Sequence, residues 1–584
     1  RGHRRRRRAP RERRLRADPR RRAGCARPGA ADARSPAGHR GADLPAHAAD
    51  ARCARRAARA RSGGRRSIGR ADRPGGAPDA DAGGPGDHGP PERDRRRGAA
   101  ESAGALLGGR VALQVGRPGA GRADGARRRA VRHEVNRLAW LALAVALLAV
   151  ASPATAQPCP DCLEAGAARV PLAVPAGAPL AGYGSLARRL LIPDVRGRHS
   201  HAFWFQPSRG ARDELAARAL VLESGGRRVA WVAVDLLAVD QTLTADAERR
   251  LGAAGVRPAT LILSASHTHS GPGAFVDSTL LGWLTLDRLD PAVREAVLGA
   301  IVGAVRQADA GRRPARLATA SVTAPGLVRS RFGQPLDHEL LVVKVTSARG
   351  EPVALVWNYA IHGTTLGPRN LRLSGDVMGE ASTLLERDLG VPVLFVNGAV
   401  GDVSPGRHGE RATAEVGAEL ASAAHAGWVS ATPIAPVLEV GHTTVALPVA
   451  RLSVRNCLRG WAPRPLTVPL GSVFPRETTL TAVALTDTGW VTLPGELQTS
   501  LGRGIKEASG LRHTLVAGLS NAYLGYLVTA ADYERPTYVS CGSVYGPQAG
   551  GCVAQAAAEL LGAVARGAGA VNARVACDLE GAAR

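Results

Sequence analysis

Two histidines separated by one residue, His267 and His269, are the first side chains whose type and spacing suggest chemistry. They end a run of apolar and β-branched residues over 259–266, which predicts a buried strand, and they precede Gly-Pro-Gly at 271–273, which predicts a turn. In an extended chain, side chains at i and i+2 point to opposite sides. The spacing therefore predicts that a metal ion takes one imidazole directly, while the other supports the site or faces the substrate. The competing interpretation is two polar residues that only close a strand.

A third histidine, His362, ends another strand-like run at 353–361 and is followed by Gly-Thr-Thr. A single histidine at such a place is more often structural, but two strands that end alike favour a metal site. Ser404, in the small-residue segment 397–405, can be a nucleophile or a donor to a developing oxyanion, and the commoner role of such a serine is a turn or helix cap. Neither Gly-x-Ser-x-Gly nor His-Glu-x-x-His occurs, so a common serine hydrolase or zinc-protease helix is not supported.

Two later segments supply oxygen atoms. Glu496 follows Pro-Gly after a strand-like run, and we expect it at the head of a helix. Tyr523 and Tyr526 offer two phenols. Taken alone, Glu496 is a favourable acid at a helix start and Tyr526 a half-buried core residue.

Seven segments acquire meaning as an ordered set over 169–565: Ser266-His-Thr-His-Ser-Gly-Pro-Gly273, Trp357-Asn-Tyr-Ala-Ile-His-Gly-Thr-Thr365, Ser374-Gly-Asp376, Asn397-Gly-Ala-Val-Gly-Asp-Val-Ser-Pro405, Pro494-Gly-Glu496, Asn521-Ala-Tyr-Leu-Gly-Tyr526 and Tyr545-Gly-Pro547. In this order they resemble the neutral (non-lysosomal) ceramidase family, and the resemblance covers only its catalytic N-terminal domain. The resemblance implies a zinc-dependent amidase. Its Zn²⁺ ligands would be His267, His362, Glu496 and Tyr526. His269 would contact the substrate or relay a proton, and Ser404 and Arg329 would line the catalytic centre.

The chemistry of these residues agrees with that implication. Imidazole and carboxylate groups suit zinc, which lowers the pKa of a bound water and polarises an amide carbonyl. We expect an N-acyl sphingoid lipid as substrate, ceramide first, and a transient contact with a membrane surface. The family often has a histidine where this chain has Arg212, so a zinc hydrolase of another N-acyl or ester substrate is an alternative. A catalytically inactive exported binding protein is another.

The remaining pattern predicts a mixed α/β (α+β) fold with one large catalytic domain, a β-sheet core and flanking helices. Helices are expected at 244–252, 291–308, 377–389 and 411–426. Strand-like runs are expected at 217–223, 229–238, 339–346, 353–361, 391–396 and 478–493.

Most of the positive charge lies in the first quarter of the chain. Of the 77 lysines and arginines, 36 are arginines in 1–134, which has 14 acidic residues and no Phe, Tyr or Trp. Such a segment cannot bury a core and is predicted to be disordered. Without aromatic residues or lysine it makes a poor nucleic-acid tail, so we expect no nucleic-acid partner. We expect it to lie upstream of the true start at Val135; an arginine-rich nucleic-acid-binding protein is the alternative if it is expressed.

Residues 135–156 have the three parts of a signal peptide, namely a basic start, an apolar stretch over 138–151 and an Ala-Thr-Ala site. We therefore expect a secreted or periplasmic protein. We expect a short linker with Cys-Pro-Asp-Cys at 157–168 and the catalytic domain at 169–577. The six cysteines after position 156 suggest up to three disulfides in an oxidising compartment. We expect the Cys-x-x-Cys to pair with the C-terminal cysteines.

Overall fold

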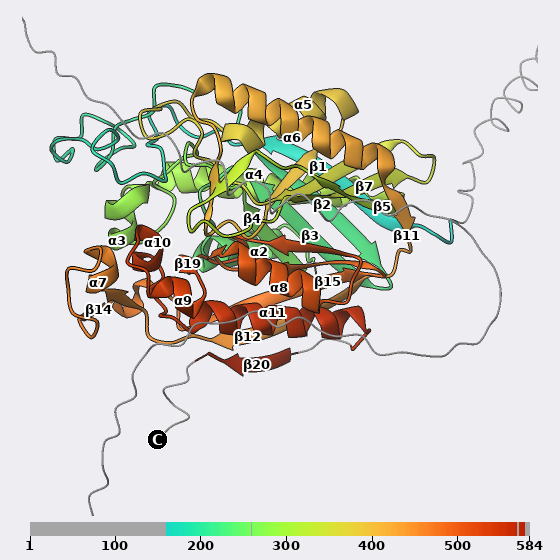
Figure 1. The fold of residues 1–584 in the computed structure, drawn as a ribbon. Coiled ribbons are helices and arrows are strands. Elements are labelled where there is room, and N and C mark those ends of the chain that lie inside the picture. Colours follow the sequence, from blue (N-terminus) through green and yellow to red (C-terminus); the bar gives the residue numbers. More distant parts are fainter. Residues whose placement is uncertain (1–158, 259, 569–571, 578–584) are drawn as a thin grey trace, which may run out of the picture. The chain divides into compact units, whose positions relative to one another are not determined.

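The computed structural model describes residues 159–258, 260–568 and 572–577. The expectations for 1–134 and for the signal peptide at 135–156 lie outside these residues. The described residues form four layers, in which two sheets pack face to face and helices cover the outer face of each (Figure 1). This arrangement confirms the predicted mixed α/β class.

The larger sheet has nine strands and is mostly antiparallel, with parallel pairs only at its two ends. Its order is β4 (Thr260–Ala265), β3 (Arg227–Val234), β2 (Ala216–Ser224), β1 (Leu163–Pro171), β5 (Arg313–Thr323), β7 (Glu339–Ser347), β8 (Pro352–Tyr359) and β9 (Val393–Asn397), with β11 (Thr432–Ile434) paired to β5. Several of its strands, such as β3 and β8, have near-continuous apolar runs because both faces of the sheet are covered.

Three long helices cover the outer face of this sheet: α4 (Pro291–Ala310), α5 (Asp376–Leu389) and α6 (Glu410–Ser430). A fourth helix, α2 (Gln241–Ala253), packs beside α4. The start of α4 follows from its sequence, because the Asp290 side chain accepts hydrogen bonds from the backbone N–H groups of Ala292 and Val293, and Pro291 occupies the first turn.

The smaller sheet has the order β18 (His513–Ala517), β16 (Thr488–Thr492), β15 (Glu477–Leu485), β12 (Glu439–Ala446) and β20 (Asn572–Ala576). Apolar side chains of both sheets form the layer between them, where the rings of Trp231 and Trp490 stack with centroids 4.8 Å apart. Helices α8 (Thr499–Ala508) and α11 (Ala549–Ala565) cover its other face.

Short elements complete the described part: α3 (Thr279–Leu281), the π-helical turn η1 (Gly282–Leu286), β6 (Val328–Ser330), β10 (Val403–Pro405), β13 (Arg451–Ser453), α7 (Val454–Cys457), β14 (Thr467–Pro469), the 3₁₀ turn η2 (Gly471–Val473), β17 (Glu496–Leu497), β19 (Tyr526–Leu527), α9 (Ala530–Tyr533) and α10 (Tyr538–Cys541). In the part of the chain that the structure describes, no helix combines the length and the apolarity that a membrane crossing requires.

Three expectations need correction. The sheet already begins at Leu163, within the expected linker, because β1 pairs with both β2 and β5. The run 478–493 is a hairpin of β15 and β16 rather than one strand; its turn uses Thr486 at φ 53° and contains no glycine that would have signalled it. Cys159 and Cys162 pair with each other and not with C-terminal cysteines, which leaves Cys457–Cys541 and Cys552–Cys577.

Candidate metal centre

The candidate site lies where the carboxyl ends of strands from both sheets converge. His267 follows β4, His362 follows β8, and Glu496 follows β16. Asn397, at the end of β9, joins the first two loops, because its Nδ2 donates to the carbonyl oxygens of Ser266 (3.0 Å) and Ile361 (2.9 Å). Its Oδ1 accepts from the backbone N–H of Ile361 at 3.2 Å. One buried amide therefore fixes the backbone next to two histidines that are 95 residues apart.

The imidazoles of His267 and His362 face each other, with their Nε2 atoms 3.0 Å apart. Both side chains are almost fully buried. The two loops approach closely because residue 363 is glycine; a Cβ there would lie 2.6 Å from the carbonyl oxygen of His267. The structure thus brings together the two histidines that the sequence placed at similar strand ends.

His269 lies on the same side as His267, and the expectation of opposite sides was wrong. The Nε2 atoms of His267 and His269 are 3.5 Å apart. The physical reason is the backbone of His267, which has φ 68° and so leaves the extended conformation before His269 is reached. Gly182 and Tyr183 hold His269 from outside, the glycine carbonyl lying 2.9 Å from Nδ1 and the tyrosine ring centroid 4.9 Å from the imidazole.

Glu496 supplies the carboxylate. It lies in β17, and helix α8 begins only at Thr499, so the expected helix start is displaced by three residues. Its Oε2 is 3.3 Å from His362 Nε2 and 3.5 Å from His267 Nε2. Its Oε1 accepts a hydrogen bond from the Tyr523 hydroxyl at 2.8 Å. Tyr526 is the direct partner of Glu496 in the parallel pair β17–β19.

Burial controls the electrostatics of this group. It lowers the pKa of His269 and of His362 well below the ordinary value, and neighbouring cationic groups add to the effect, so both rings are neutral at neutral pH. Burial alone would raise the pKa of Glu496, but contacts with His267, Arg331 and Tyr523 outweigh it and the pKa is lowered. Burial and the Glu496 charge raise the pKa of the Tyr526 phenol well above its ordinary value.

Ser404 lies in β10, which pairs with β6 so that Ser404 faces Arg329 in the register. The Arg329 side chain is nevertheless exposed, and the position expected for it is taken by Arg331. Arg331 Nε donates to Ser404 Oγ at 2.9 Å, and its Nη1 donates to the Gly401 carbonyl at 3.1 Å. Strand β6 ends at Ser330, and the chain then bends and turns Arg331 inward.

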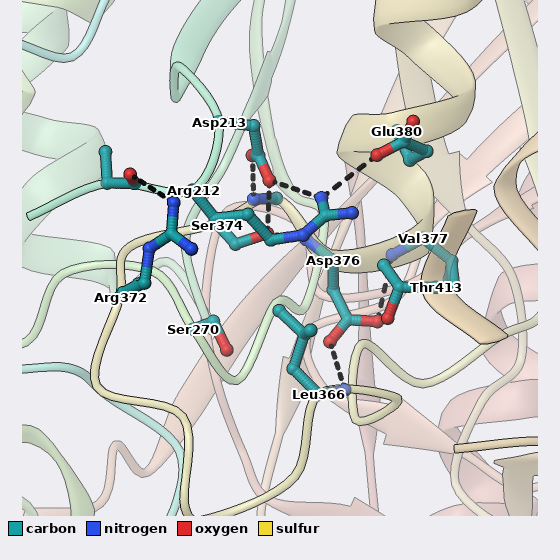
Figure 2. A network of polar contacts seen from close by, with 12 residues as sticks. Arg212, Asp213, Ser270, Leu366, Arg372, Ser374, Asp376, Val377, Glu380 and Thr413 are labelled. Carbon is teal, nitrogen blue, oxygen red and sulfur yellow. Dashed lines mark hydrogen bonds and ion pairs between the residues drawn. The ribbon is translucent and has the colours of Figure 1, made fainter. Parts of the chain in front are cut away.

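Arg212, where the related family often has a histidine, belongs to a separate polar network (Figure 2). Its guanidinium contacts Asp213, Glu380 and Glu410 at 2.8–2.9 Å. Asp213 in turn accepts hydrogen bonds from the Ser374 hydroxyl and from the Gly375 N–H. Through Glu380 and Glu410, Arg212 connects the loop before β2 to helices α5 and α6.

The same network reaches the site through backbone contacts. The carbonyl of Ser374 accepts a hydrogen bond from Thr268 Oγ1 at 2.7 Å, and Thr268 lies between the two histidines of the pair. Asp376, fully buried, accepts from Thr365 and from the N–H of Leu366, in the loop that follows His362 (Figure 2). The network therefore supports the backbone of both histidine loops without contacting an imidazole.

The inward-facing atoms suit a metal ion. The Nδ1 atoms of His267 and His269 lie 2.7 Å from the Leu237 carbonyl and 2.9 Å from the Gly182 carbonyl. A carbonyl only accepts, so these contacts assign the proton to each Nδ1 and leave a lone pair on each Nε2. Among the described residues, Glu496 Oε2 is buried without a hydrogen-bond partner. Lone pairs that point toward a common position in this way can bind a cation placed there.

One ligand atom from each of His267, His269 and His362 lies within 4.8 Å of the others, so these three can hold a metal ion. Glu496 adds an oxygen beside them, and Tyr526 lies next to Glu496. The roles predicted for His267, His362, Glu496, Tyr526, Ser404 and His269 stay predictions, and the structure places all six in one region. Sequence reasoning missed Asn397 and Arg331 as site residues, although both stand within or next to segments that it singled out.

A four-layer α/β fold with three imidazoles and a buried carboxylate defines the general class, an α/β protein with a candidate metal centre. Residues 200–422 match the family model described as neutral/alkaline non-lysosomal ceramidase, N-terminal. The predicted resemblance to this family is thereby confirmed. All three histidines and Ser404 lie within the matched residues, whereas Glu496 and Tyr526 lie beyond them.

Curated relatives with similar sequences are neutral ceramidases. Neutral ceramidase B of Dictyostelium discoideum is 26% identical over 233 residues, covering 35% of this chain and 32% of that protein. The neutral ceramidase of Pseudomonas aeruginosa is 28% identical over 222 residues, covering 34% and 33%. That of Mycobacterium tuberculosis is 29% identical over 209 residues, covering 32% of each. The matched segments thus span about a third of the length of these relatives.

A solved structure extends the similarity of fold. The crystal structure of neutral ceramidase from Pseudomonas aeruginosa matches with a TM-score of 0.61 at 20% identity, covering 71% of this chain and 76% of that one. A structure titled "Ceramidase complexed with C2" matches with the same TM-score and identity and covers 77% of that chain. The fold is therefore shared well beyond residue 422.

Proposed function

We propose that the protein is an exported zinc-dependent amide hydrolase that cleaves an N-acyl sphingolipid, ceramide first, to a sphingoid base and a fatty acid. The observation that carries the proposal is the convergence of three imidazole Nε2 atoms and Glu496 Oε2 from three segments that are distant in sequence. The names of the curated relatives support the substrate class.

Four residues would hold the ion: His267, His362, Glu496 and Tyr526. Nitrogen and oxygen ligands of this kind suit zinc. A bound zinc ion would supply Lewis acidity at the amide carbonyl and lower the pKa of a water molecule to about 7. The phenol of Tyr526 needs such a cation nearby, because burial and Glu496 otherwise keep it protonated.

His269 would then carry the proton. Its Nδ1–H is engaged by Gly182, so Nε2 is the free base, and burial keeps the ring neutral. Its side chain is less buried than those of His267 and His362, which supports a position facing the substrate. From there Nε2 can accept a proton from the attacking water and deliver it to the leaving nitrogen.

Ser404 suits the role of hydrogen-bond donor better than that of nucleophile. Arg331 Nε donates to Ser404 Oγ and so occupies one of its lone pairs. The hydroxyl hydrogen stays available, and the adjacent guanidinium strengthens it as a donor to a developing oxyanion. The alternative of a serine nucleophile would need a base at Oγ, where the structure places a cation.

A partly apolar cleft of about 320 Å³ supports a lipid substrate. Its lining includes Phe275, Val276, Leu281, Leu286, Val473 and Tyr523. The Tyr523 hydroxyl donates to Glu496, so one lining residue of the cleft contacts the candidate centre. The difference from the family at Arg212 does not favour another substrate, because this side chain is held by three carboxylates, those of Asp213 and Glu380 (Figure 2) and that of Glu410.

Export is part of the proposal. It rests on the sequence of 135–156 and agrees with three disulfides among the described residues.

The test measures bound metal and turnover of a fluorescent short-chain ceramide with protein expressed from Gln157. We expect one zinc per chain, and loss of both zinc and turnover in His267→Ala. His425→Ala is the matched control, since His425 is a half-exposed histidine of α6 whose Nε2 lies 3.2 Å from Asp388 Oδ2. Full turnover after the metal is stripped by a chelator would refute the mechanism.

A further inference from the structure

The loop before β2 exposes an unusual set of apolar side chains. Leu186 is 84% exposed, Leu191 100%, Ile192 71% and Val195 75%. This teal segment lies on the side of the structure where α3 is found (Figure 1). Single exposed apolar residues are normal on a protein surface, but several large ones within ten residues mark an interaction site.

The loop forms one surface with η1. Arg189 Nε donates to the Gly184 carbonyl at 3.0 Å, its Nη2 donates to the carbonyl of Trp283, and its guanidinium lies 5.1 Å from the Trp283 ring centroid. Trp283 and Leu284 are themselves 48% and 42% exposed. We call this surface the apolar rim; it consists of Leu186, Leu191, Ile192, Val195, Trp283 and Leu284.

A groove starts at the apolar rim and continues toward the candidate centre. The outer groove, about 540 Å³, is lined by Trp283 and Leu280 on one side and by Ser472 and Val473 on the other. It shares lining residues with the inner cleft that includes Tyr523. Tyr523, at the inner cleft, donates to Glu496 and so separates the groove from the proposed ligands by one side chain.

The segment on the far side of the groove is also apolar at its surface. It leads up to Val473 and carries Leu458, Trp461, Leu466 and Val468, and the Trp461 side chain is 91% exposed. The disulfide Cys457–Cys541 attaches it to α10. Exposed apolar side chains therefore also occur in the segment that leads to the lining residue Val473.

The charge on the rim loop favours an anionic surface. Arg196 and Arg198 are exposed, and Arg198 Nε lies 3.7 Å from Asp194 Oδ1. The acid between Ile192 and Arg196, Asp194, is buried and accepts a hydrogen bond from the His199 N–H at 2.6 Å. The outward side of the loop therefore presents arginines next to leucine and isoleucine, the combination by which interfacial segments bind anionic lipids.

We propose that the apolar rim docks the protein on an anionic phospholipid surface, from which the N-acyl lipid enters through the groove. This inference rests on the proposed function for its substrate, but the docking itself does not require turnover. A lipid surface fits better than a second protein, because a protein partner seated on the rim would block the entrance of the groove.

The experiment compares binding of the full chain to vesicles of phosphatidylcholine with and without phosphatidylglycerol. We expect the double variant Leu191→Ser/Ile192→Ser to bind mixed vesicles about tenfold more weakly or worse, since two large apolar side chains no longer enter the lipid. Arg196→Gln should reduce only the part of the binding that depends on phosphatidylglycerol. Val429→Ser is the control, because Val429 is 69% exposed at the end of α6.

Turnover separates this proposal from the proposed function. The double variant should lose turnover of ceramide in vesicles and keep its zinc and its turnover of a soluble short-chain substrate. Unchanged vesicle binding by the double variant would overturn the docking proposal. A wild-type protein that is dimeric, with a double variant that is monomeric, would also overturn it. Wild-type protein that binds vesicles through the rim but hydrolyses neither substrate would uphold the docking and refute the proposed function.

Discussion

Replacing Asn397 by leucine should loosen the candidate metal centre without removing any of its proposed ligands. The amide lies fully buried and bridges the carbonyl groups of Ser266 and Ile361, each next to a histidine. Leucine has a similar size but no hydrogen-bonding group. The variant therefore frees the two histidine loops while the imidazoles themselves stay present.

The magnitude follows from the contacts. Asn397→Leu leaves two carbonyl groups and the Ile361 N–H without this partner. Each buried group that loses its partner costs about 1–3 kcal/mol, so the free energy of unfolding should fall by several kcal/mol. Groups that orient metal ligands typically change metal affinity by about 10–100-fold, and we expect a zinc affinity lower by that factor in the folded protein.

Asn358 provides the matched control. It is another buried asparagine, whose Nδ2 donates to the carbonyls of Val396 and Val516. It lies within β8, before the loop that carries His362. Asn358→Leu should destabilise the fold to a similar degree and leave the zinc affinity of the folded protein near that of the wild type. Zinc titration with a competing chelator, at a temperature where circular dichroism shows both variants folded, makes the comparison. Equal zinc affinity in the two variants would refute the reasoning.

Two further substitutions separate roles within the site. His269→Ala should keep its zinc and lose turnover by about 10²–10⁴-fold, the usual contribution of a general acid–base group; loss of zinc, measured by metal analysis, would instead make His269 a ligand. Ser404→Ala should reduce kcat by about 10²–10³-fold, as expected for one oxyanion donor. A loss near 10⁶-fold in steady-state assays would indicate a nucleophile.

The sequence predicted several long elements of the fold well where their hydrophobic periodicity is strong, but it did not predict helix α11 or strand β5, which have 17 and 11 residues. Helix α4 was expected at 291–308 and ends at Ala310, and β8 was expected at 353–361 and spans Pro352–Tyr359. The sequence predicted poorly those strands that form only because they pair with neighbouring strands. The glycine- and alanine-rich β1 has little strand propensity, and only its pairing with β2 and β5 makes it a central strand.

The candidate site was predictable as a set of residues but not as a geometry. The family resemblance carried by the ordered segments singled out His267, His362 and Glu496, which the structure brings within 3.5 Å of one another. The sequence could not show that Arg331, and not Arg329, contacts Ser404, because this depends on strand β6 ending after three residues. Alternation along a strand says nothing about a side chain beyond its end.

The backbone of His267 explains why the three imidazoles meet. A positive φ at a non-glycine residue costs free energy and persists only where surrounding contacts hold it. Here the His267 N–H donates to the Leu236 carbonyl and its Nδ1 lies against the Leu237 carbonyl. Residue 363 is glycine, and a Cβ there would lie only 2.6 Å from the His267 carbonyl oxygen. The protein itself thus orients the rings toward a common point. A metal ion would enter a site already arranged by hydrogen bonds. Asn397 contributes no proposed ligand atom, so its replacement should show how much of the zinc affinity comes from this arrangement.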